Sequence, residues 1–377
     1  MKIGILSLVL HNNYGGILQA YALQTVLERM GHEVVVFNKV IPIRKVRFQI
    51  ILKRFVKKLL GYDIVVFGER KEFREAPIVN KNFLSFRKKY IHEEFISNFN
   101  DIVNYKLDCI VVGSDQVWRP KYFKEEWLEP MENAFLSFTR DWTIKRVSYA
   151  ASFGTDSWEY TDFETDKIRE SVKLFNAISV RESSGIPLLR KYLNVDSELV
   201  LDPTLLLSKN DYINLFKISN VKQSSGNLLV YLLDPTVRQK EMIKKIEESK
   251  GLTSFSVNRR SISLTAPIEQ RILPSVESWL RGFYDAELIV TDSFHACVFS
   301  IIFGKPFVVF GNKERGISRL KSLLNKFCLT ACLIDENIDT NRMSNIINQI
   351  DFSKVDELLE IERTVSRKFL HSALSES

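Results

Sequence analysis

The chain has few of the residues that build metal centres and disulfide frameworks. Its 377 residues include four cysteines and five histidines. Only Cys328 and Cys332 lie close together, and no second pair or neighbouring histidine completes a zinc site. Acidic residues do not cluster in a metal-binding pattern either. We therefore expect reduced structural thiols and neither a metal nor a cofactor.

Long apolar runs are also missing. No stretch has the length of a membrane span. The apolar segment 1–10 leads into His11 and Asn12 instead of a small-residue cleavage site, so we interpret it as the first buried strand of a cytoplasmic protein. The Gly-x-Gly-x-x-Gly fingerprint of dinucleotide sites is absent as well, which removes the basis for inferring NAD.

What the sequence does contain is a repeated pattern of short apolar strands that end in polar turns. A chain of 377 residues suits two domains. The pattern predicts two Rossmann-like, doubly wound α/β domains that face a central cleft. We expect an N-terminal domain over 1–217, a C-terminal domain over 226–350, and a helix over 351–377 that packs back on the N-terminal domain.

The most informative turn follows the apolar strand predicted at 287–291. It reads Asp292-Ser293-Phe294-His295 and opens a helix. In open parallel sheets ligands collect at the carboxyl ends of strands, where helix N-termini favour anions. Asp292 or Ser293 could instead be a simple helix cap and His295 a packed ring. The cations Lys305, Lys313, Arg315 and Arg319 follow closely, and this context favours a site.

A second unusual segment spans residues 44–60. It carries seven basic residues and no acid, and its apolar residues fall on the opposite face of a predicted helix. Such a helix can lie on an anionic membrane, which would make the protein peripheral to the cytoplasmic membrane. It can equally pack on its own domain with a solvated basic face. Both interpretations stay open at this stage.

Six motifs, taken in order, resemble the polysaccharide pyruvyl transferase family. They are Asn13-Tyr-Gly-Gly-Ile-Leu-Gln-Ala-Tyr-Ala-Leu23, Val112-Gly-Ser-Asp-Gln-Val-Trp118, Tyr149-Ala-Ala-Ser-Phe-Gly154, Val180-Arg-Glu182, Leu201-Asp-Pro-Thr204 and Thr291-Asp-Ser-Phe-His295. The resemblance implies a fold like that of GT-B glycosyltransferases and phosphoenolpyruvate as donor. The implied product is a pyruvate ketal on a sugar of a surface or capsular polysaccharide.

The resemblance also assigns donor-side residues. His295 matches the family histidine and Arg181 the family arginine after a mid-chain strand, while either Lys313 or Arg315 matches a downstream basic residue. The family often has Arg-Leu-His where this chain has Ser293-Phe-His295, so one cation is missing. The resemblance therefore implies donor binding by Ser293, by Arg181 and by the cations between 313 and 319.

Ketal formation requires a group that moves protons near neutral pH and cations for a carboxylate and a phosphate. His295 is the expected acid/base, with phosphate binding as its alternative role. Arg181 offers a bidentate grip, with an ion pair to Glu182 or a bridge at the domain interface as the alternative. We expect the acceptor sugar on the N-terminal side, beside Asn13, Tyr14, Gly15, Gly16 and Asp115.

Two other functions remain open on sequence grounds. One is a GT-B sugar-nucleotide glycosyltransferase, since a fold does not decide function. The other is a non-catalytic glycan-assembly protein. A net charge of +7 points to an anionic partner, but no nucleic-acid module is present and we expect no nucleic-acid binding. The sequence leaves open whether the acceptor is lipid-linked, nucleotide-linked or polymeric.

Overall fold

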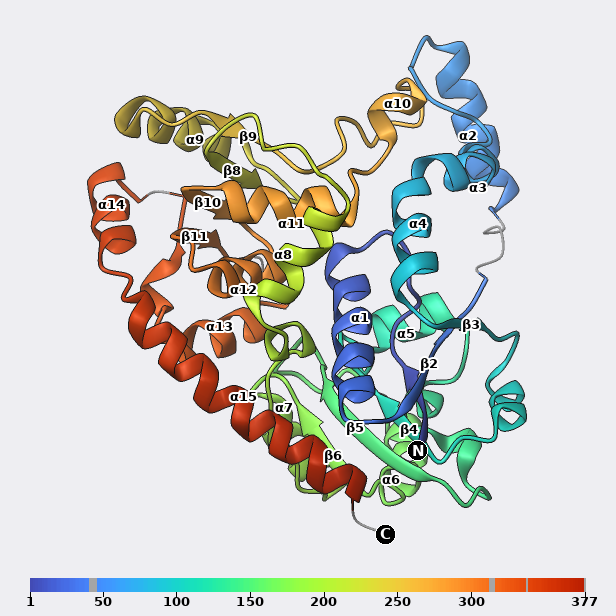
Figure 1. Ribbon diagram of the computed structural model, residues 1–377. Coiled ribbons are helices and arrows are strands. Elements are labelled where there is room, and N and C mark those ends of the chain that lie inside the picture. The colour runs from blue at the N-terminus through green and yellow to red at the C-terminus, as the bar shows by residue number, and fades with distance from the viewer. Residues whose placement is uncertain (41–45, 312–315, 337, 376–377) are drawn as a thin grey trace.

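The first half of the chain is built on a parallel sheet of seven strands in the order β3-β2-β1-β4-β5-β6-β7. The computed structural model describes residues 1–40, 46–311, 316–336 and 338–375 (Figure 1). The strands are β1 Lys2–Leu6, β2 Glu33–Asn38, β3 Glu93–Phe95, β4 Cys109–Val112, β5 Lys145–Ala151, β6 Ala177–Val180 and β7 Glu198–Leu199. The apolar runs of β1, β2 and β4 fit strands that are covered on both faces.

The second half is built on a parallel sheet of five strands in the order β12-β11-β10-β8-β9. These strands are β8 Leu228–Tyr231, β9 Ser254–Phe255, β10 Leu288–Thr291, β11 Phe307–Phe310 and β12 Leu333–Ile334. In the first sheet the strand order reverses between β1 and β4: β2 and β3 follow β1 on one side, and β4 to β7 are added on the other. In the second sheet it reverses between β8 and β10 in the same way. The fold class is therefore α/β with two doubly wound sheets, as predicted.

Helices cover both sheets and join them. They are α1 Tyr14–Arg29, α2 Phe48–Leu59, α3 Gly68–Val79, α4 Lys81–Tyr90, α5 Pro120–Trp127, α6 Asp162–Val172, α7 Gly185–Leu188, α8 Lys209–Ile218, α9 Val237–Lys250, α10 Ile268–Arg271, α11 Val276–Asp285, α12 Phe294–Phe303, α13 Ile317–Lys326, α14 Thr340–Asn348 and α15 Phe352–Ser375. Among the described residues, none of these helices combines the length and apolarity needed to cross a bilayer.

Apolar packing continues from one half of the chain to the other. Tyr14 of α1 stacks on Trp279 of α11 with ring centroids 5.2 Å apart, and its hydroxyl donates to the carbonyl of Pro274 at 2.8 Å. Both rings belong to one buried cluster that also contains Phe299 of α12. The N-terminus of α1 is therefore held directly against the C-terminal half, and this contact positions the site described below.

The last helix returns to the first half of the chain. In Figure 1 α15 runs from the second sheet down along the first. The Arg363 guanidinium donates to the carbonyls of Leu205 and Leu207, and the Ser366 hydroxyl accepts from the Leu201 backbone at 2.9 Å. These bonds connect α15 to the turn that follows β7.

Candidate functional site

One large pocket lies where the two halves meet, and the starts of three helices reach it. Its volume is about 1120 Å³. The first residues of α1, α12 and α13, which are Tyr14, Phe294 and Ile317, all line it. Free backbone N–H groups and the helix dipole make such N-termini favourable for anions. The pocket is therefore suited to a negatively charged ligand, and it has room for a second molecule beside it.

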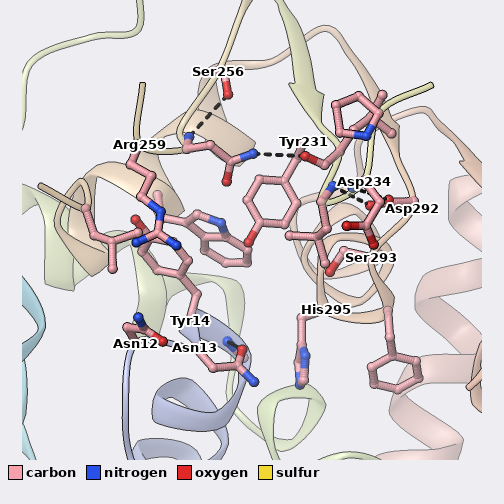
Figure 2. Close-up of a pocket in the computed structure, with 18 of the residues that line it drawn as sticks. Asn12, Asn13, Tyr14, Tyr231, Asp234, Ser256, Arg259, Asp292, Ser293 and His295 are labelled. Carbon is pink, nitrogen blue, oxygen red and sulfur yellow. Dashed lines mark hydrogen bonds between the residues drawn. The ribbon is translucent and has the colours of Figure 1, made fainter. Parts of the chain in front are cut away.

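His295 occupies the start of α12, directly after strand β10. Asp292 accepts hydrogen bonds from the backbones of Leu233 at 2.9 Å and Asp234 at 3.2 Å, so it fastens the end of β10 to the end of β8. Ser293 is the N-cap residue, but its side chain makes no capping hydrogen bond. Figure 2 shows Ser293 and His295 on the same side of the pocket, with His295 extending towards α1.

The His295 imidazole is 8% exposed and is neutral at rest. Burial lowers its pKa to about 4. Asp202 and Asp115 act against burial and raise the pKa, while Arg181 and Arg319 lower it further. Its Nε2 atom has no hydrogen-bond partner among the described residues and lies 3.8 Å from Oδ2 of Asp202. A carboxylate at this distance can orient the ring without a direct hydrogen bond.

Arg181 does not line this pocket, which changes the role expected for it. Its guanidinium is buried behind the pocket wall, where NH1 donates to Asp202 at 2.6 Å and NH2 to Asp115 at 3.0 Å. Burial lowers the pKa of Arg181, but the carboxylates of Asp202, Asp115 and Glu182 together outweigh burial and raise it. The alternative to donor binding was an ion pair with Glu182 or a bridge at the domain interface. Glu182 lies 4.0 Å from the Arg181 guanidinium, and the shorter ion pairs are with Asp115 and Asp202.

The two carboxylates are ionised in this cluster. Burial raises the pKa of Asp115 and of Asp202, but Arg181, the neighbouring positive groups and the hydrogen bonds together outweigh burial and hold both pKa values below the usual range. Asp202 also accepts hydrogen bonds from the backbone and hydroxyl of Thr204 and from the amide of Gln19. Asp115 lines the pocket, while Asp202 stands behind His295.

Arg319 is a buried cation that reaches the pocket from the C-terminal half. It comes from the first turn of α13, is 7% exposed and lies 3.6 Å from Asp115. Burial lowers its pKa to about 10, and it stays charged at neutral pH. Arg319 and Arg181 both contact the Phe294 ring, at 5.3 Å and 4.8 Å from its centroid. This contact fixes the guanidinium of Arg319 beside the start of α12.

In the loop that contains Asn13, Gly15 and Gly16, it is Gly15 that approaches the His295 ring closely, and Gly16 does not. Asn13 caps α1 by accepting from the Gly15 backbone at 3.1 Å, and Asn13, Tyr14 and Gly15 line the pocket. A Cβ atom on Gly15 would lie 2.0 Å from Nδ1 of His295. A Cβ on Gly16 would find its nearest neighbour at 3.7 Å, and Gly16 does not line the pocket.

This difference in spacing predicts that alanine substitutions at the two neighbouring glycines affect kcat/KM very differently. Gly15→Ala should displace the His295 ring and lower kcat/KM by about 100-fold, because misplacement by about 1 Å can cost that much. Gly16→Ala should keep kcat/KM within about twofold and stabilise α1 slightly, since alanine favours helices. Steady-state kinetics and thermal melting on both variants measure the two effects. Equal kinetics for both would contradict the close approach.

Two predicted donor residues, Lys313 and Arg315, lie outside the described residues. Several polar residues at the pocket were not singled out from the sequence. Arg259 and Arg260, which follow β9, and Lys240 of α9 line it. Gln19 lies behind the lining and donates to Asp202. The sequence signal that could have indicated them is the pair of adjacent arginines directly after a strand. Figure 2 shows Arg259 above Tyr14, across the pocket from Asp234.

Comparisons with known proteins agree with this fold. Arabidopsis thaliana UGT89C1 complexed with UDP-L-rhamnose matches with a TM-score of 0.52 and 10% identity over 99% of this chain and 98% of that chain. UDP-GlcNAc 2-epimerase from Neisseria meningitidis bound to UDP-GlcNAc matches with a TM-score of 0.49 and 12% identity over 97% and 94%. The match to UGT89C1, together with the two parallel sheets, identifies the overall fold as GT-B-like. No curated protein matches significantly.

The sequence itself matches a family model over most of its length. The model describes polysaccharide pyruvyl transferases and matches residues 13–314. That range begins at the loop of Asn13 and includes Asp115, Asp202 and His295, which the fold brings together. The chain therefore belongs to the polysaccharide pyruvyl transferase family.

Proposed function

We propose that the protein transfers the enolpyruvyl group of phosphoenolpyruvate to two hydroxyls of a sugar, forming a pyruvate ketal during surface or capsular polysaccharide synthesis. The observation that carries this proposal is the meeting of three helix N-termini with Arg319 and the neutral His295 in one pocket. A donor with both a phosphate and a carboxylate needs several positive groups around it, and this arrangement supplies them.

The reaction can be written so that every proton is accounted for. A sugar hydroxyl oxygen bonds to C2 of the enolpyruvyl group, and its proton reaches the methylene carbon, which becomes a methyl group. The bond from C2 to the phosphate oxygen then breaks and inorganic phosphate leaves. The second hydroxyl oxygen bonds to C2, and its proton leaves with the phosphate.

In this scheme His295 moves the first proton. Because its pKa is about 4, the ring is neutral and can accept a hydroxyl proton before passing it to the methylene carbon. Nε2 faces Asp202, while Nδ1 lies on the side of Gly15. We assign Nε2 the resting proton, held towards the Asp202 carboxylate, and Nδ1 the reacting position. The acceptor sugar then lies beside Asn13, Tyr14 and Asp115.

Arg319 is assigned to the donor. Arg319→Gln should raise the KM for phosphoenolpyruvate about 10- to 100-fold, the effect of losing a hydrogen bond to a charged group. Lys321→Gln, on the exposed side of the same helix, is the matched control and should leave that KM unchanged. Initial rates at varied donor concentration measure both. A KM that is equal in the two variants would remove Arg319 from the donor site.

The function is tested by incubating the protein with phosphoenolpyruvate and candidate acceptors, including lipid-linked oligosaccharides. Mass spectrometry should show the mass of a pyruvate ketal on one acceptor, with release of one inorganic phosphate per product. Consumption of a sugar nucleotide with release of a nucleoside diphosphate, and no ketal, would instead establish the glycosyltransferase alternative.

A further inference from the structure

Helix α2 has an apolar face that no other described part of the chain covers. None of its residues is buried. Phe48, Leu52, Phe55 and Leu59 recur at helical spacing and form one line, which we call the α2 stripe. Their exposed fractions are 75, 51, 52 and 74%. Figure 1 shows α2 at the edge of the molecule, away from both sheets. An exposed apolar line of this size indicates an interaction surface.

The charge around the stripe has a single sign. Lys53, Lys57 and Lys58 are exposed, and residues 46–62 include no acid. On another side of the helix Arg54 forms a bidentate pair with Glu69 of α3, at 2.7 and 2.8 Å. This pair holds α2 against α3. The side of α2 that makes the contact carries neither the stripe nor Lys53 and Lys57. The stripe and these lysines are therefore left exposed by the contact that holds α2.

We propose that α2 docks the protein on an anionic lipid surface, with the stripe at the boundary of headgroups and acyl chains and the lysines among the phosphates. Bilayers combine an apolar layer with a layer of negative charge, and amphipathic helices with basic polar faces bind both. A second copy of this chain would bring lysines against lysines, and a nucleic acid would leave the stripe in water. The complementarity of charge and apolarity favours lipid.

The docking surface is connected to the rim of the pocket. The loop before α10 contributes Arg259 and Arg260 to the pocket lining. Thr265 of the same loop donates to Asp63, in the segment between α2 and α3, at 2.6 Å. Arg271 of α10 pairs with Glu75 of α3, also at 2.6 Å. Docking through α2 would thus hold the pocket near the bilayer. If the proposed function is right, this position suits a lipid-linked acceptor, but docking itself does not depend on that function.

The first test measures binding to vesicles of phosphatidylcholine with and without phosphatidylglycerol by co-sedimentation. Replacing Lys53, Lys57 and Lys58 with glutamine should lower the partition coefficient for anionic vesicles about 100-fold. Raising the salt concentration should weaken parental binding in the same direction. The control replaces Lys217, Lys244 and Lys245, three exposed lysines on α8 and α9, and should retain parental binding.

The second test removes the stripe without changing charge. Phe48→Ser with Leu59→Ser should lower the partition coefficient at least about tenfold, because large apolar side chains no longer enter the interface. Phe163→Ser with Ile218→Ser is the matched control, since each of those side chains is 69% exposed elsewhere. Equal binding by the stripe variant and its control would overturn the proposal. So would a parental dimer in analytical ultracentrifugation that the stripe variant converts to monomer, because a second copy would then cover α2.

A separate readout distinguishes docking from the proposed function. Turnover of a water-soluble acceptor should be unchanged in the lysine and stripe variants, because α2 does not line the pocket. Loss of vesicle binding with intact turnover supports docking alone. A parent that binds anionic vesicles but forms no ketal would contradict the proposed function and leave docking supported.

Discussion

Replacing His295 with alanine should lower kcat about 10²- to 10⁴-fold, the usual contribution of a positioned acid/base. The ring is buried at the start of α12, close to Asp202 on one side and Gly15 on the other. No second histidine lies among the described residues that line the pocket. The affinity for phosphoenolpyruvate should change little, because Arg319 and the helix N-termini remain. Single-turnover rates at saturating donor measure the chemical step directly.

His371→Ala is the matched control, because His371 is exposed on α15. That variant should have parental kinetics. A folded His295→Ala protein that turns over at the parental rate would exclude His295 from proton transfer. If only donor affinity falls and the single-turnover rate is kept, His295 belongs to the phosphate site and the proton is moved by another group.

The pH dependence gives an independent check on the same residue. His295 acts as a base only while neutral, so kcat/KM should stay level as the pH falls through 6.5 and decline as it approaches about 4. Stability should follow the same window. The folded pKa lies below the unfolded value, so the free energy of unfolding falls between pH 6.5 and about 4. His295→Ala should lose that part of the decline.

Apolar runs predicted most of the strands, and their polar ends predicted where the site would lie. The strands β1, β4, β10 and β11 are continuous apolar segments, which is the pattern of a buried parallel strand. Strand β3 was not predicted, because its sequence is Glu93-Glu-Phe95 and it pairs only with β2 at the sheet edge. Its position depends on a neighbour that local sequence does not reveal.

The polar cluster shows where reasoning from sequence reaches its limit. Asp115, Arg181 and His295 were all predicted to lie at the site, because each follows an apolar strand. Their division of roles depends on depth below the surface, which the pattern does not encode. Arg181 turns inward to Asp115 and Asp202. Arg319, which was predicted only as one of the donor-side cations between 313 and 319, lines the pocket. The contact between Gly15 and His295 joins residues far apart in sequence and required the fold.

The buried position of Arg181 predicts a large loss of stability when its charge is removed. Arg181→Met should lower the free energy of unfolding by about 3–5 kcal/mol, because it leaves Asp115 and Asp202 buried without their main cation. Arg190→Met is the matched control. Arg190 is 75% exposed and pairs with an exposed Asp196, so its removal should change stability by less than about 0.5 kcal/mol. Urea denaturation of both variants measures the difference.

The pH dependence of that loss identifies its cause. In the parent, Arg181 helps to hold the pKa values of Asp115 and Asp202 below those of the unfolded chain. The ionised carboxylates therefore stabilise the fold above the unfolded pKa, and this stabilisation is lost as the pH falls through the folded pKa values. Without Arg181, burial raises those pKa values, and stability is instead lost as the pH rises through them. The gap between parent and Arg181→Met should therefore be smallest near pH 4 and widen towards pH 7. Arg181→Lys separates this role from donor binding: parental stability with a raised KM for phosphoenolpyruvate would return Arg181 to the donor site, whereas lowered stability supports its place in the buried cluster.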